Sequence, residues 1–283
     1  MVKKVAVIND ISGLGKCSLT AAIPVLSVMG VQACPIPTAV LSNQTDYDSY
    51  YYIDCTSHMD AYISEWKKLG LELDGIYSGF LGHEEQVDKV LQFINDFKRE
   101  NSLILVDPVM GDNGTPYDVY TPQLGSKMRK LASSADVITP NITELCMLTD
   151  TDYDSLQASQ TSDNYLDQIV SIAQKLLTDN CRTIIVTGIL YKAATDFEER
   201  FYNLVLTVDG HQYVSATIQG GSYSGTGDLM ASIVCAGMIN GKSALECVEL
   251  ASHFLETAMK DTIKGNTHRN DGINFEPFLR MLL

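Results

Sequence analysis

Positive charge is scarce in this sequence. Lysines and arginines number 20 against 35 aspartates and glutamates, so the formal net charge is −15 at pH 7. This excess of negative charge opposes binding to nucleic acids and to anionic membranes, and we expect neither as a partner. Any phosphate that the protein handles must meet positive potential from backbone amides, from a few basic side chains or from metal ions.

Long hydrophobic runs are also missing. No stretch approaches the roughly 20 apolar residues that a membrane-spanning helix needs. The apolar run after Met1–Lys4 covers only Val5–Ile8, which is too short for the core of a secretory signal. We therefore expect a cytoplasmic protein that does not associate with membranes.

Cysteine and histidine motifs are absent as well. The seven cysteines form no Cys-x-x-Cys pair, and neither they nor the five histidines have the spacing of metal ligands. An odd number of scattered cysteines favours a reducing compartment over a disulfide-stabilised fold. No arrangement of serine, histidine and aspartate suggests a catalytic triad.

The sequence contains no internal repeat and no linker rich in proline or serine. Its 283 residues are 45% apolar, which is enough to form one large hydrophobic core. We therefore expect a single domain spanning residues 1–283. The polar stretch Thr149–Asn164 is predicted to be a mobile surface loop.

Short apolar segments alternate with longer amphipathic segments over most of the chain. The apolar segments predict strands at Val5–Ile8, Val31–Ile36, Gly75–Tyr77, Leu103–Val106, Val137–Thr139, Thr183–Thr187, Phe201–Val208 and Tyr213–Ile218. The amphipathic segments predict helices at Leu19–Met29, Met59–Leu69, Glu84–Glu100, Pro122–Leu131, Tyr165–Thr178, Asp228–Asn240, Ser243–Lys260 and Phe275–Leu283. This alternation is typical of an α/β fold with a mostly parallel central sheet and helices on both faces. The short turn between the last two strands predicts a hairpin, and so an antiparallel edge.

Polar residues follow several of the predicted strands directly. They are Asn9 and Asp10, Ser78 and Gly79, Asp107, Thr139 to Asn141, and Thr187 with Gly188. In parallel sheets, functional residues gather beyond the carboxyl ends of the strands. We therefore expect these groups to meet at one edge of the sheet.

A glycine-rich turn runs from Gly220 to Asp228 and precedes an apolar segment that predicts a helix. Small residues before a helix leave backbone N–H groups free to bind an anion. The Asp228 carboxylate at the edge of this turn is placed to take a proton from a nucleophile that faces the anion. The pattern indicates phosphoryl transfer to an alcohol, although helix capping by Asp228 explains the same residues equally well. A carboxylate at a helix N-terminus should also have a lowered pKa, which would make Asp228 a weak base.

The segment Ser12–Ser18 has some features of a P-loop but does not match it. The motif requires a glycine where Asp10 stands and a serine or threonine where Cys17 stands. We interpret the segment as a flexible loop that lets the backbone approach a small ligand, with polar contacts from Ser12 and Asp10.

Carboxylates follow the strand Leu103–Val106. Asp107 and Asp112 stand five residues apart, and Glu144 lies at the start of a helical segment after Asn141. Hard oxygen ligands of this kind suit Mg²⁺ shared with substrate phosphates. Capping of the helix by Asn141 and Glu144 is the alternative interpretation for that pair.

Two further segments offer contacts for a ring-shaped ligand. Ser42–Thr45 lies in a loop rich in hydroxyl groups and tyrosines, which either covers an aromatic ligand or is a solvated turn. Phe80 follows the strand Gly75–Tyr77, where its ring is placed to stack on a ring substrate.

Together these segments resemble the ribokinase-like superfamily and, within it, the pyridoxal (pyridoxamine) kinases. The resemblance covers nearly the whole chain, and its most specific pieces are Ser42–Tyr47, Asp107–Asp112, Ile138–Glu144 and Gly225–Asp228. The last piece marks the superfamily, and the first two narrow the resemblance to the kinases of vitamin B6. It implies a ribokinase-like three-layer sandwich and, because family members often act as homodimers, a homodimer.

The resemblance further implies ATP-dependent phosphorylation of the 5-hydroxymethyl group of pyridoxal, pyridoxamine or pyridoxine. Asp228 would be the catalytic base, and the amides of Gly225, Thr226 and Gly227 would form the anion hole. The implied substrate contacts are Ser12, Asn43, Thr45 and Phe80, and the implied ATP contacts are Asn141, Thr187 and Gly188. Mg²⁺ would be organised by Asp107, Asp112 and Glu144, with Thr139 and Thr187 near a monovalent cation, K⁺ or Na⁺.

Two alternatives remain open at this point. The segment Asn9–Ser12 is closer to the hydroxymethylpyrimidine kinases of the same fold, so a pyrimidine is a second candidate substrate. The other alternative is a non-catalytic ligand-binding relative, against which the retention of Asp107, Glu144 and Asp228 argues.

Overall fold

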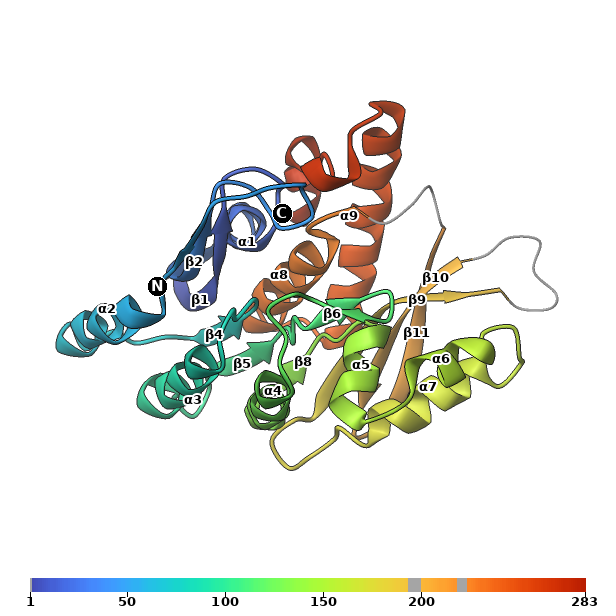
Figure 1. Ribbon diagram of the computed structural model, residues 1–283, viewed down its shortest axis with the longest axis horizontal. Coiled ribbons are helices and arrows are strands. Elements are labelled where there is room, and N and C mark those ends of the chain that lie inside the picture. Colours follow the sequence, from blue (N-terminus) through green and yellow to red (C-terminus); the bar gives the residue numbers. More distant parts are fainter. Residues whose placement is uncertain (1, 193–199, 218–222) are drawn as a thin grey trace.

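The computed structural model describes residues 2–192, 200–217 and 223–283. Its main feature is a nine-stranded sheet with the strand order β11-β10-β9-β8-β5-β4-β1-β2-β3 (Figure 1). The strands of this sheet are β1 (Lys3–Ser12), β2 (Val31–Leu41), β3 (Tyr52–Asp54), β4 (Gly75–Ser78), β5 (Leu103–Val106), β8 (Val137–Ile138), β9 (Thr183–Tyr191), β10 (Arg200–Thr207) and β11 (Gly210–Thr217). A separate two-stranded sheet is formed by β6 (Gly111–Asp112) and β7 (Thr115–Pro116).

The middle of the sheet is parallel, as predicted. Strands β2, β1, β4, β5, β8 and β9 pair in parallel in that spatial order. The predicted hairpin is confirmed, because β10 and β11 pair antiparallel and β10 also pairs antiparallel with β9. The opposite edge is antiparallel too, through β3 on β2. That second antiparallel edge was not predicted, since three residues are too short to give a pattern.

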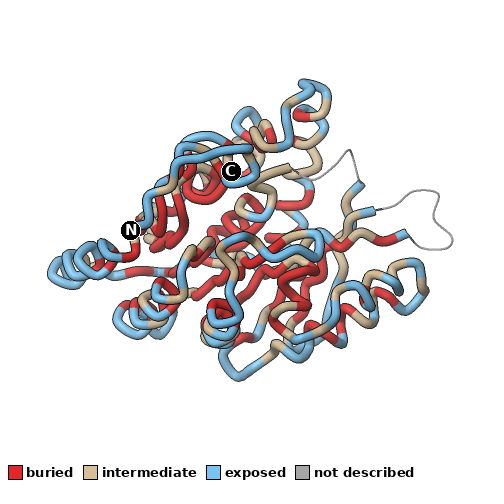
Figure 2. Tube along the Cα trace, viewed as in Figure 1, coloured by how far each residue is buried: buried red, intermediate tan, exposed pale blue. Residues whose placement is uncertain are grey.

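Helices cover both faces of the sheet and complete a three-layer α/β fold (Figure 1). On one face lie α1 (Ser18–Val28), α8 (Thr226–Ile239), α9 (Ala244–Lys264) and the short helix η2 (Glu276–Leu282). On the other face lie α2 (Thr56–Lys68), α3 (Glu84–Phe97), α4 (Pro122–Ser134), α5 (Ile142–Thr149), α6 (Tyr153–Ala158) and α7 (Tyr165–Gln174). The buried segments of Figure 2 concentrate where these helices meet the strands.

The alternation of side chains along each strand divides the core into two clusters. In β4, Ile76 belongs to the cluster under α3 and α4, whereas its neighbour Tyr77 belongs to the cluster under α8. Because successive strand residues point to opposite faces, each central strand must be apolar on both sides. This requirement explains the continuous apolar runs from which the strands were predicted.

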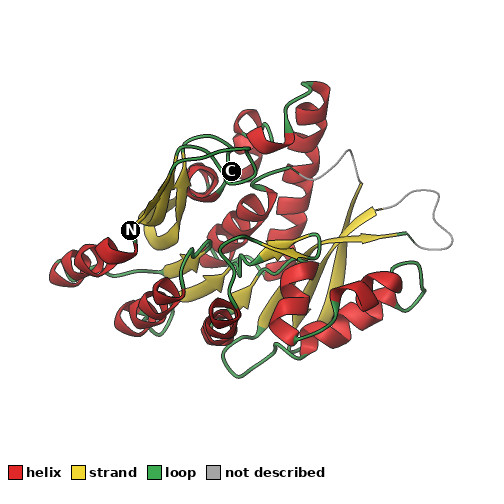
Figure 3. Cartoon of the chain, in the orientation of Figure 1, coloured by secondary structure: helices red, strands yellow, loops and turns green. Residues whose placement is uncertain are grey.

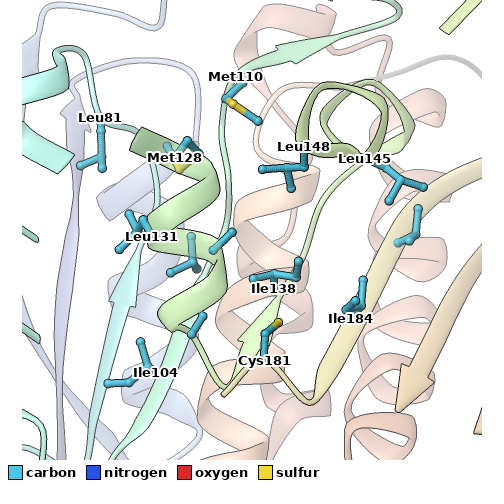
Figure 4. Close-up of a cluster of buried hydrophobic side chains, with 14 of the residues drawn as sticks. Leu81, Ile104, Met110, Met128, Leu131, Ile138, Leu145, Leu148, Cys181 and Ile184 are labelled. Atoms are coloured by element: carbon cyan, nitrogen blue, oxygen red, sulfur yellow. The ribbon is translucent and has the colours of Figure 1, made fainter. Parts of the chain in front are cut away.

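Helix α4 shows how one outer helix is seated. Thr121 caps its N-terminus, with Oγ1 accepting a hydrogen bond from the Leu124 amide at 3.0 Å, and Pro122 occupies the first helical turn. The helix lies beside the strands of the sheet (Figure 3), and its buried residues Met128 and Leu131 pack with Ile104 and Ile138 of those strands (Figure 4). Polar contacts add to this packing, because Arg129 Nη2 donates to Met147 O at 3.0 Å and Lys127 pairs with Asp88 at 2.5 Å.

Two local predictions were wrong. Residues 149–164 are not a simple loop, because α6 lies within them and Asp152 caps it by accepting a hydrogen bond from Ser155 N at 2.8 Å. The C-terminal segment predicted as a helix is a 3₁₀ helix, η2. Ile218, predicted as the end of the last strand, and Gly220–Ser222 of the glycine-rich turn lie outside the described residues.

Among the described residues, no helix combines the length and the apolar character that crossing a membrane requires. All seven cysteines are free thiols, as their scattered spacing predicted. Four of them are buried within the two core clusters, where they act as small apolar side chains: Cys146, Cys181, Cys235 and Cys247.

Candidate active site

Polar side chains meet at the carboxyl edge of the parallel strands, beside the N-terminus of α8. Ile8 and Val106 end the buried runs of β1 and β5 and belong to the core cluster away from α8. The next residue in each case, Asn9 or Asp107, therefore faces the α8 side of the sheet. The predicted convergence at one sheet edge thus follows from the register of the strands.

Asn9 is the centre of the hydrogen-bond network at this edge. Its Nδ2 donates to Asp228 Oδ1 at 3.2 Å, and its Oδ1 accepts from the amides of Phe80 at 2.8 Å and Asp10 at 3.0 Å. The pairing of β1 with β2 shifts register between Asn9 and Ile11, which gives a bulge of the kind that re-aims side chains next to active sites. Gly79 makes room for the Asn9 amide, because a Cβ there would lie 2.4 Å from Asn9 Nδ2.

The N-terminus of α8 presents backbone amides to the same edge. Gly225 is the N-cap with φ +80°, and the first amide bonded within the helix is that of Leu229, which donates to Gly225 O at 3.0 Å. The amides of the first helical turn therefore lack partners inside the helix and are free to bind an anion. A Cβ on Gly225 would lie 2.1 Å from Lys16 O, so only glycine fits there. Gly227, in contrast, is exposed and faces open space.

Asp228 does not cap the helix; it turns toward Asn9 in the interior of the edge. Burial raises its pKa to about 6, and the Asp10 carboxylate adds to this rise, while the Ser18 backbone and the Asn9 side chain oppose it. The expected lowering of the pKa was therefore wrong. The helix N-terminus stabilises the anion less than the loss of water destabilises it, so Asp228 is a better base than a surface aspartate.

Two carboxylates predicted to organise magnesium are buried near Asp228. Burial and the Asp228 charge raise the pKa of Asp107 to about 7, although its Oδ1 accepts a hydrogen bond from Thr139 Oγ1 at 3.0 Å. Glu144 and Asn141 form a capping box on α5, with Asn141 N donating to Glu144 Oε2 at 2.9 Å. Burial and Asp107 raise the pKa of Glu144 well above its usual range. The capping interpretation is therefore correct for Asn141 and Glu144, and it leaves their part in catalysis to be tested.

The donor set suits Mg²⁺ that keeps much of its water. Asp112 is half-buried on β6, and burial raises its pKa. Burial destabilises the ionised form of three carboxylates at this edge, those of Asp107, Asp112 and Glu144. A hard divalent cation bound nearby would stabilise that ionised form. Among the described residues, no three aspartates, glutamates, histidines or cysteines form a ready-made metal cage. The residues therefore fit an ion shared with substrate phosphates better than a fully protein-ligated one.

The predicted substrate residues occupy different environments. Ser12 is buried, and its hydroxyl donates to Asp10 Oδ2 at 2.9 Å. Asn43 holds its own loop, since Nδ2 donates to Ser49 O at 2.8 Å, whereas Thr45 is exposed. Phe80 is partly exposed, and its backbone is fixed from both sides, by Asn9 and by Thr38 Oγ1 at 2.9 Å from Phe80 O.

The predicted nucleotide residues lie along the same edge, near β9. Asn141 pairs with Thr187 as an isolated parallel bridge, and Asn141 Nδ2 donates to Gly111 O at 2.9 Å. Gly188 N donates to Asn203 Oδ1 at 3.0 Å, so that amide already has a partner. Asn203 was not predicted, because a single asparagine inside an apolar strand gives no pattern.

Sequence reasoning also missed the roles of Asn9 and Gln44. Asn9 was noted only as a polar residue after a strand, and its bond to Asp228 joins residues 219 positions apart. Gln44 is buried in the loop after β2, where its backbone N–H donates a hydrogen bond to Leu14 O at 2.9 Å. The position of Asn9 at the end of a strand could have indicated its role. The sequence contains no comparable indication for Gln44.

The raised pKa of Asp228 leads to a prediction for the pH dependence of turnover. We expect kcat/KM for the substrate alcohol to increase with pH through an acid limb near pH 6, because the carboxylate must be ionised to accept a proton. Asp10→Asn removes a like charge, so the limb should move to lower pH. Asn9→Ala removes a hydrogen bond to the ionised form, so the limb should move to higher pH.

The measurement is kcat/KM against pH for the three proteins at one Mg-ATP concentration, with circular dichroism to verify folding at each pH. Opposite displacements of the limb identify Asp228 as the titrating group. A limb at the same pH in all three proteins would assign it to another group.

This chain resembles known proteins in sequence and in fold. Residues 17–272 match the phosphomethylpyrimidine kinase family. Pyridoxal kinase of Aliivibrio fischeri is 26% identical over 274 residues, which cover 92% of this chain and 90% of that protein. A candidate phosphomethylpyrimidine kinase of Bacteroides thetaiotaomicron, solved in a crystal form with pyridoxal, is 35% identical with a TM-score of 0.90 over 100% of this chain and 96% of that one. Pyridoxal kinase from Lactobacillus plantarum is 27% identical with a TM-score of 0.87 over 100% and 97% of the two chains. The chain belongs to the phosphomethylpyrimidine kinase family and has the ribokinase-like fold of the pyridoxal kinases.

Proposed function

We propose that this protein transfers the γ-phosphate of ATP to the 5-hydroxymethyl group of a B6 vitamer, namely pyridoxal, pyridoxamine or pyridoxine. The observation that carries the proposal is the position of Asp228. Its carboxylate, ionised above a pH of about 6, lies at the N-terminus of α8, where the amides of the first turn have no partner within the helix. A base and an anion site at one point are what phosphoryl transfer to an alcohol requires.

In this proposal Asp228 accepts the proton of the attacking hydroxyl, and Asn9 holds the carboxylate in place. Phosphoryl transfer has a loose transition state, so the proton leaves late and a base of moderate strength is sufficient. The amides around Gly225, Thr226 and Gly227 face the equatorial oxygens of the transferring group. Mg²⁺ held near Asp107, Asp112 and Glu144 supplies the charge neutralisation that this acidic protein lacks.

The remaining assignments follow the same arrangement. Phe80 packs against the pyridine ring, with Ser12, Asn43 and Thr45 as polar contacts around it. Asn141, Thr187 and Gly188 border the nucleotide, and Thr139 with Asp107 borders a monovalent cation, K⁺ or Na⁺. We propose that the chain acts as one kinase domain, in the cytoplasm.

A second candidate is a hydroxymethylpyrimidine kinase, which the name of the matching family favours. Release of ADP in a coupled assay separates the two functions when each B6 vitamer and hydroxymethylpyrimidine are supplied at equal concentration. We expect higher kcat/KM for a B6 vitamer. Preference for the pyrimidine would replace the proposed substrate, and ligand binding without ADP release would indicate a non-catalytic relative.

We also propose that the protein is a homodimer that uses the β2–β3 edge. Val40, Tyr51 and Ile53 are exposed there, and β3 ends the sheet with an unpaired backbone edge. Light scattering should give twice the chain mass of 31.1 kDa for the wild type and the monomer mass for Ile53→Asp. Leu69→Asp, at a more exposed apolar position outside the sheet edge, is the control and should stay dimeric. A monomeric wild type, or a dimeric Ile53→Asp, would refute this interface.

A further inference from the structure

A short C-terminal segment, His268–Gly272, crosses over the loops at the carboxyl edge, and we refer to it as the strap. It contains the 3₁₀ turn η1 (Arg269–Asp271), capped by His268 Nδ1, which accepts a hydrogen bond from Asn270 N at 3.3 Å. Consecutive strap residues contact segments that lie more than 40 and more than 220 positions earlier in the chain. None of these residues belongs to the site described above.

One side of the strap contacts residues 42–47 in the loop after β2. We refer to these residues as the substrate loop, because they include the proposed substrate contacts Asn43 and Thr45. Asn270 O accepts a hydrogen bond from Gln44 Nε2 at 3.3 Å, and Asn270 Nδ2 donates to Asp46 O at 2.7 Å. Tyr47 Oη donates to the Asp271 carboxylate. The strap therefore adds three hydrogen bonds to those that the loop after β2 makes within itself and to the Leu14 carbonyl.

The other side of the strap holds residues 224–227 at the start of α8, which we refer to as the anion turn. Arg269 O accepts a hydrogen bond from Ser224 N at 3.1 Å, immediately before the N-cap Gly225. Residue 225 in turn contacts the backbone of Lys16, whose Nζ donates to Asn274 Oδ1 at 3.1 Å and pairs with Glu276 at 3.0 Å. Residues 13–16, the glycine loop after β1, therefore contact the same C-terminal region.

Gly272 is the point at which these segments meet. It has φ +80°, and a Cβ there would lie 2.6 Å from Gly15 O, 2.9 Å from Lys16 Cβ and 3.2 Å from Ser224 O. Two of these neighbours are backbone atoms, which cannot move aside as a flexible side chain would. A larger residue must therefore displace the strap from the anion turn, from the glycine loop, or from both.

We propose that the strap residues Asn270, Asp271 and Gly272 are positioning residues that hold the substrate loop and the anion turn in one fixed relation. The inference rests on the proposed function, in which one loop holds the attacking alcohol and the other the phosphate. Transfer requires the reacting atoms to be aligned, and a misplacement of about 1 Å can cost roughly 100-fold in rate. The strap fixes that alignment through hydrogen bonds at both ends.

The test uses two matched pairs of variants in the full-length protein. Gly272→Ala is compared with Gly30→Ala, because both glycines have a positive φ, +80° and +78°, but a Cβ at Gly30 meets no atom of the described residues within 4 Å, so only the first substitution displaces the strap. Asp271→Ala is compared with Asp271→Asn, which keeps an oxygen to accept the Tyr47 hydroxyl. Each protein is assayed with whichever alcohol the wild type phosphorylates.

We expect Gly272→Ala to lower kcat/KM for the alcohol roughly 100-fold while KM for ATP changes by less than about threefold. Gly30→Ala should retain wild-type kinetics despite the strain of a side chain at a positive φ. Asp271→Ala should lower kcat/KM about tenfold, and Asp271→Asn should recover most of it. Equal kinetic effects in Gly272→Ala and Gly30→Ala would reduce the strap to a structural role and overturn the proposal.

Hydrogen exchange supplies a readout that does not depend on activity. Asp271→Ala should accelerate exchange both in residues 42–47 and at Ser224–Thr226, because the strap joins them. Acceleration confined to residues 42–47 would overturn the link, even if the protein phosphorylates a B6 vitamer. Conversely, inactivity of the wild type toward every B6 vitamer would refute the proposed function and leave the exchange result to decide the link by itself.

Discussion

Asp228→Asn lowers kcat by at least about 1,000-fold and leaves KM for ATP nearly unchanged, if Asp228 is the base that accepts the alcohol proton. The substitution is well suited to the test, because the asparagine keeps an oxygen that accepts the hydrogen bond from Asn9 Nδ2. It also removes a partly buried charge that Asp10 and Asp107 repel. The variant should therefore be at least as stable as the wild type.

The measurement combines kcat and KM for both substrates with a thermal melt. Asn9→Ala is the control for a damaged network, since it keeps the carboxylate and removes its hydrogen bond. We expect that control to lose far less activity than Asp228→Asn. Near-normal turnover of Asp228→Asn would remove Asp228 from the mechanism.

Gly227→Ala is expected to give a stable but nearly inactive protein. Its Cβ would meet no atom of the described residues within 4 Å, and alanine is the better helix former by about 1 kcal/mol, so the melting temperature should be kept or raised. The open space beside Gly227 is where we place the transferring phosphate, and a methyl group there keeps the anion from the amides. Loss of one such contact typically costs about 100- to 1,000-fold in kcat.

Gly225→Ala is the matched comparison for this prediction. Its Cβ would lie 2.1 Å from Lys16 O at a positive φ, so it should lose stability as well as activity. A fall in kcat without a fall in melting temperature is thus specific to Gly227→Ala. Full activity of Gly227→Ala would show that the phosphate does not approach the first turn of α8.

The fold was predictable because the central strands are buried on both faces. Runs such as Val5–Ile8 and Leu103–Val106 must be apolar throughout, and a run of that kind is visible in a single sequence. β3 is only three residues long and half exposed, so no hydrophobic pattern marked it. The α6 helix was missed for a similar reason, since Leu156 is its one buried residue.

The proximity of Asp107 and Asp228 was predictable, but the direction of the pKa shift of Asp228 was not. Asp107 and Asp228 were found because each stands at the end of an apolar run or at a glycine-rich turn. The pKa of Asp228 was predicted in the wrong direction, because the helix N-terminus is visible in the sequence whereas the burial of the carboxylate is not. The contacts of His268–Gly272 join segments distant in the chain, and nothing local in the sequence indicates them.

The identity of the product from pyridoxal and Mg-ATP tests the central claim most directly. Free pyridoxal closes on itself, because its 5-hydroxymethyl group adds to its aldehyde, and phosphorylation of that hydroxyl prevents the closure. Mass spectrometry and ³¹P NMR of the reaction mixture, with Asp228→Asn as the blank, should therefore show one phosphate ester on the 5-hydroxymethyl oxygen and an open aldehyde. ADP formed with no phosphate on pyridoxal, or the same product at the same rate from Asp228→Asn, would contradict the account.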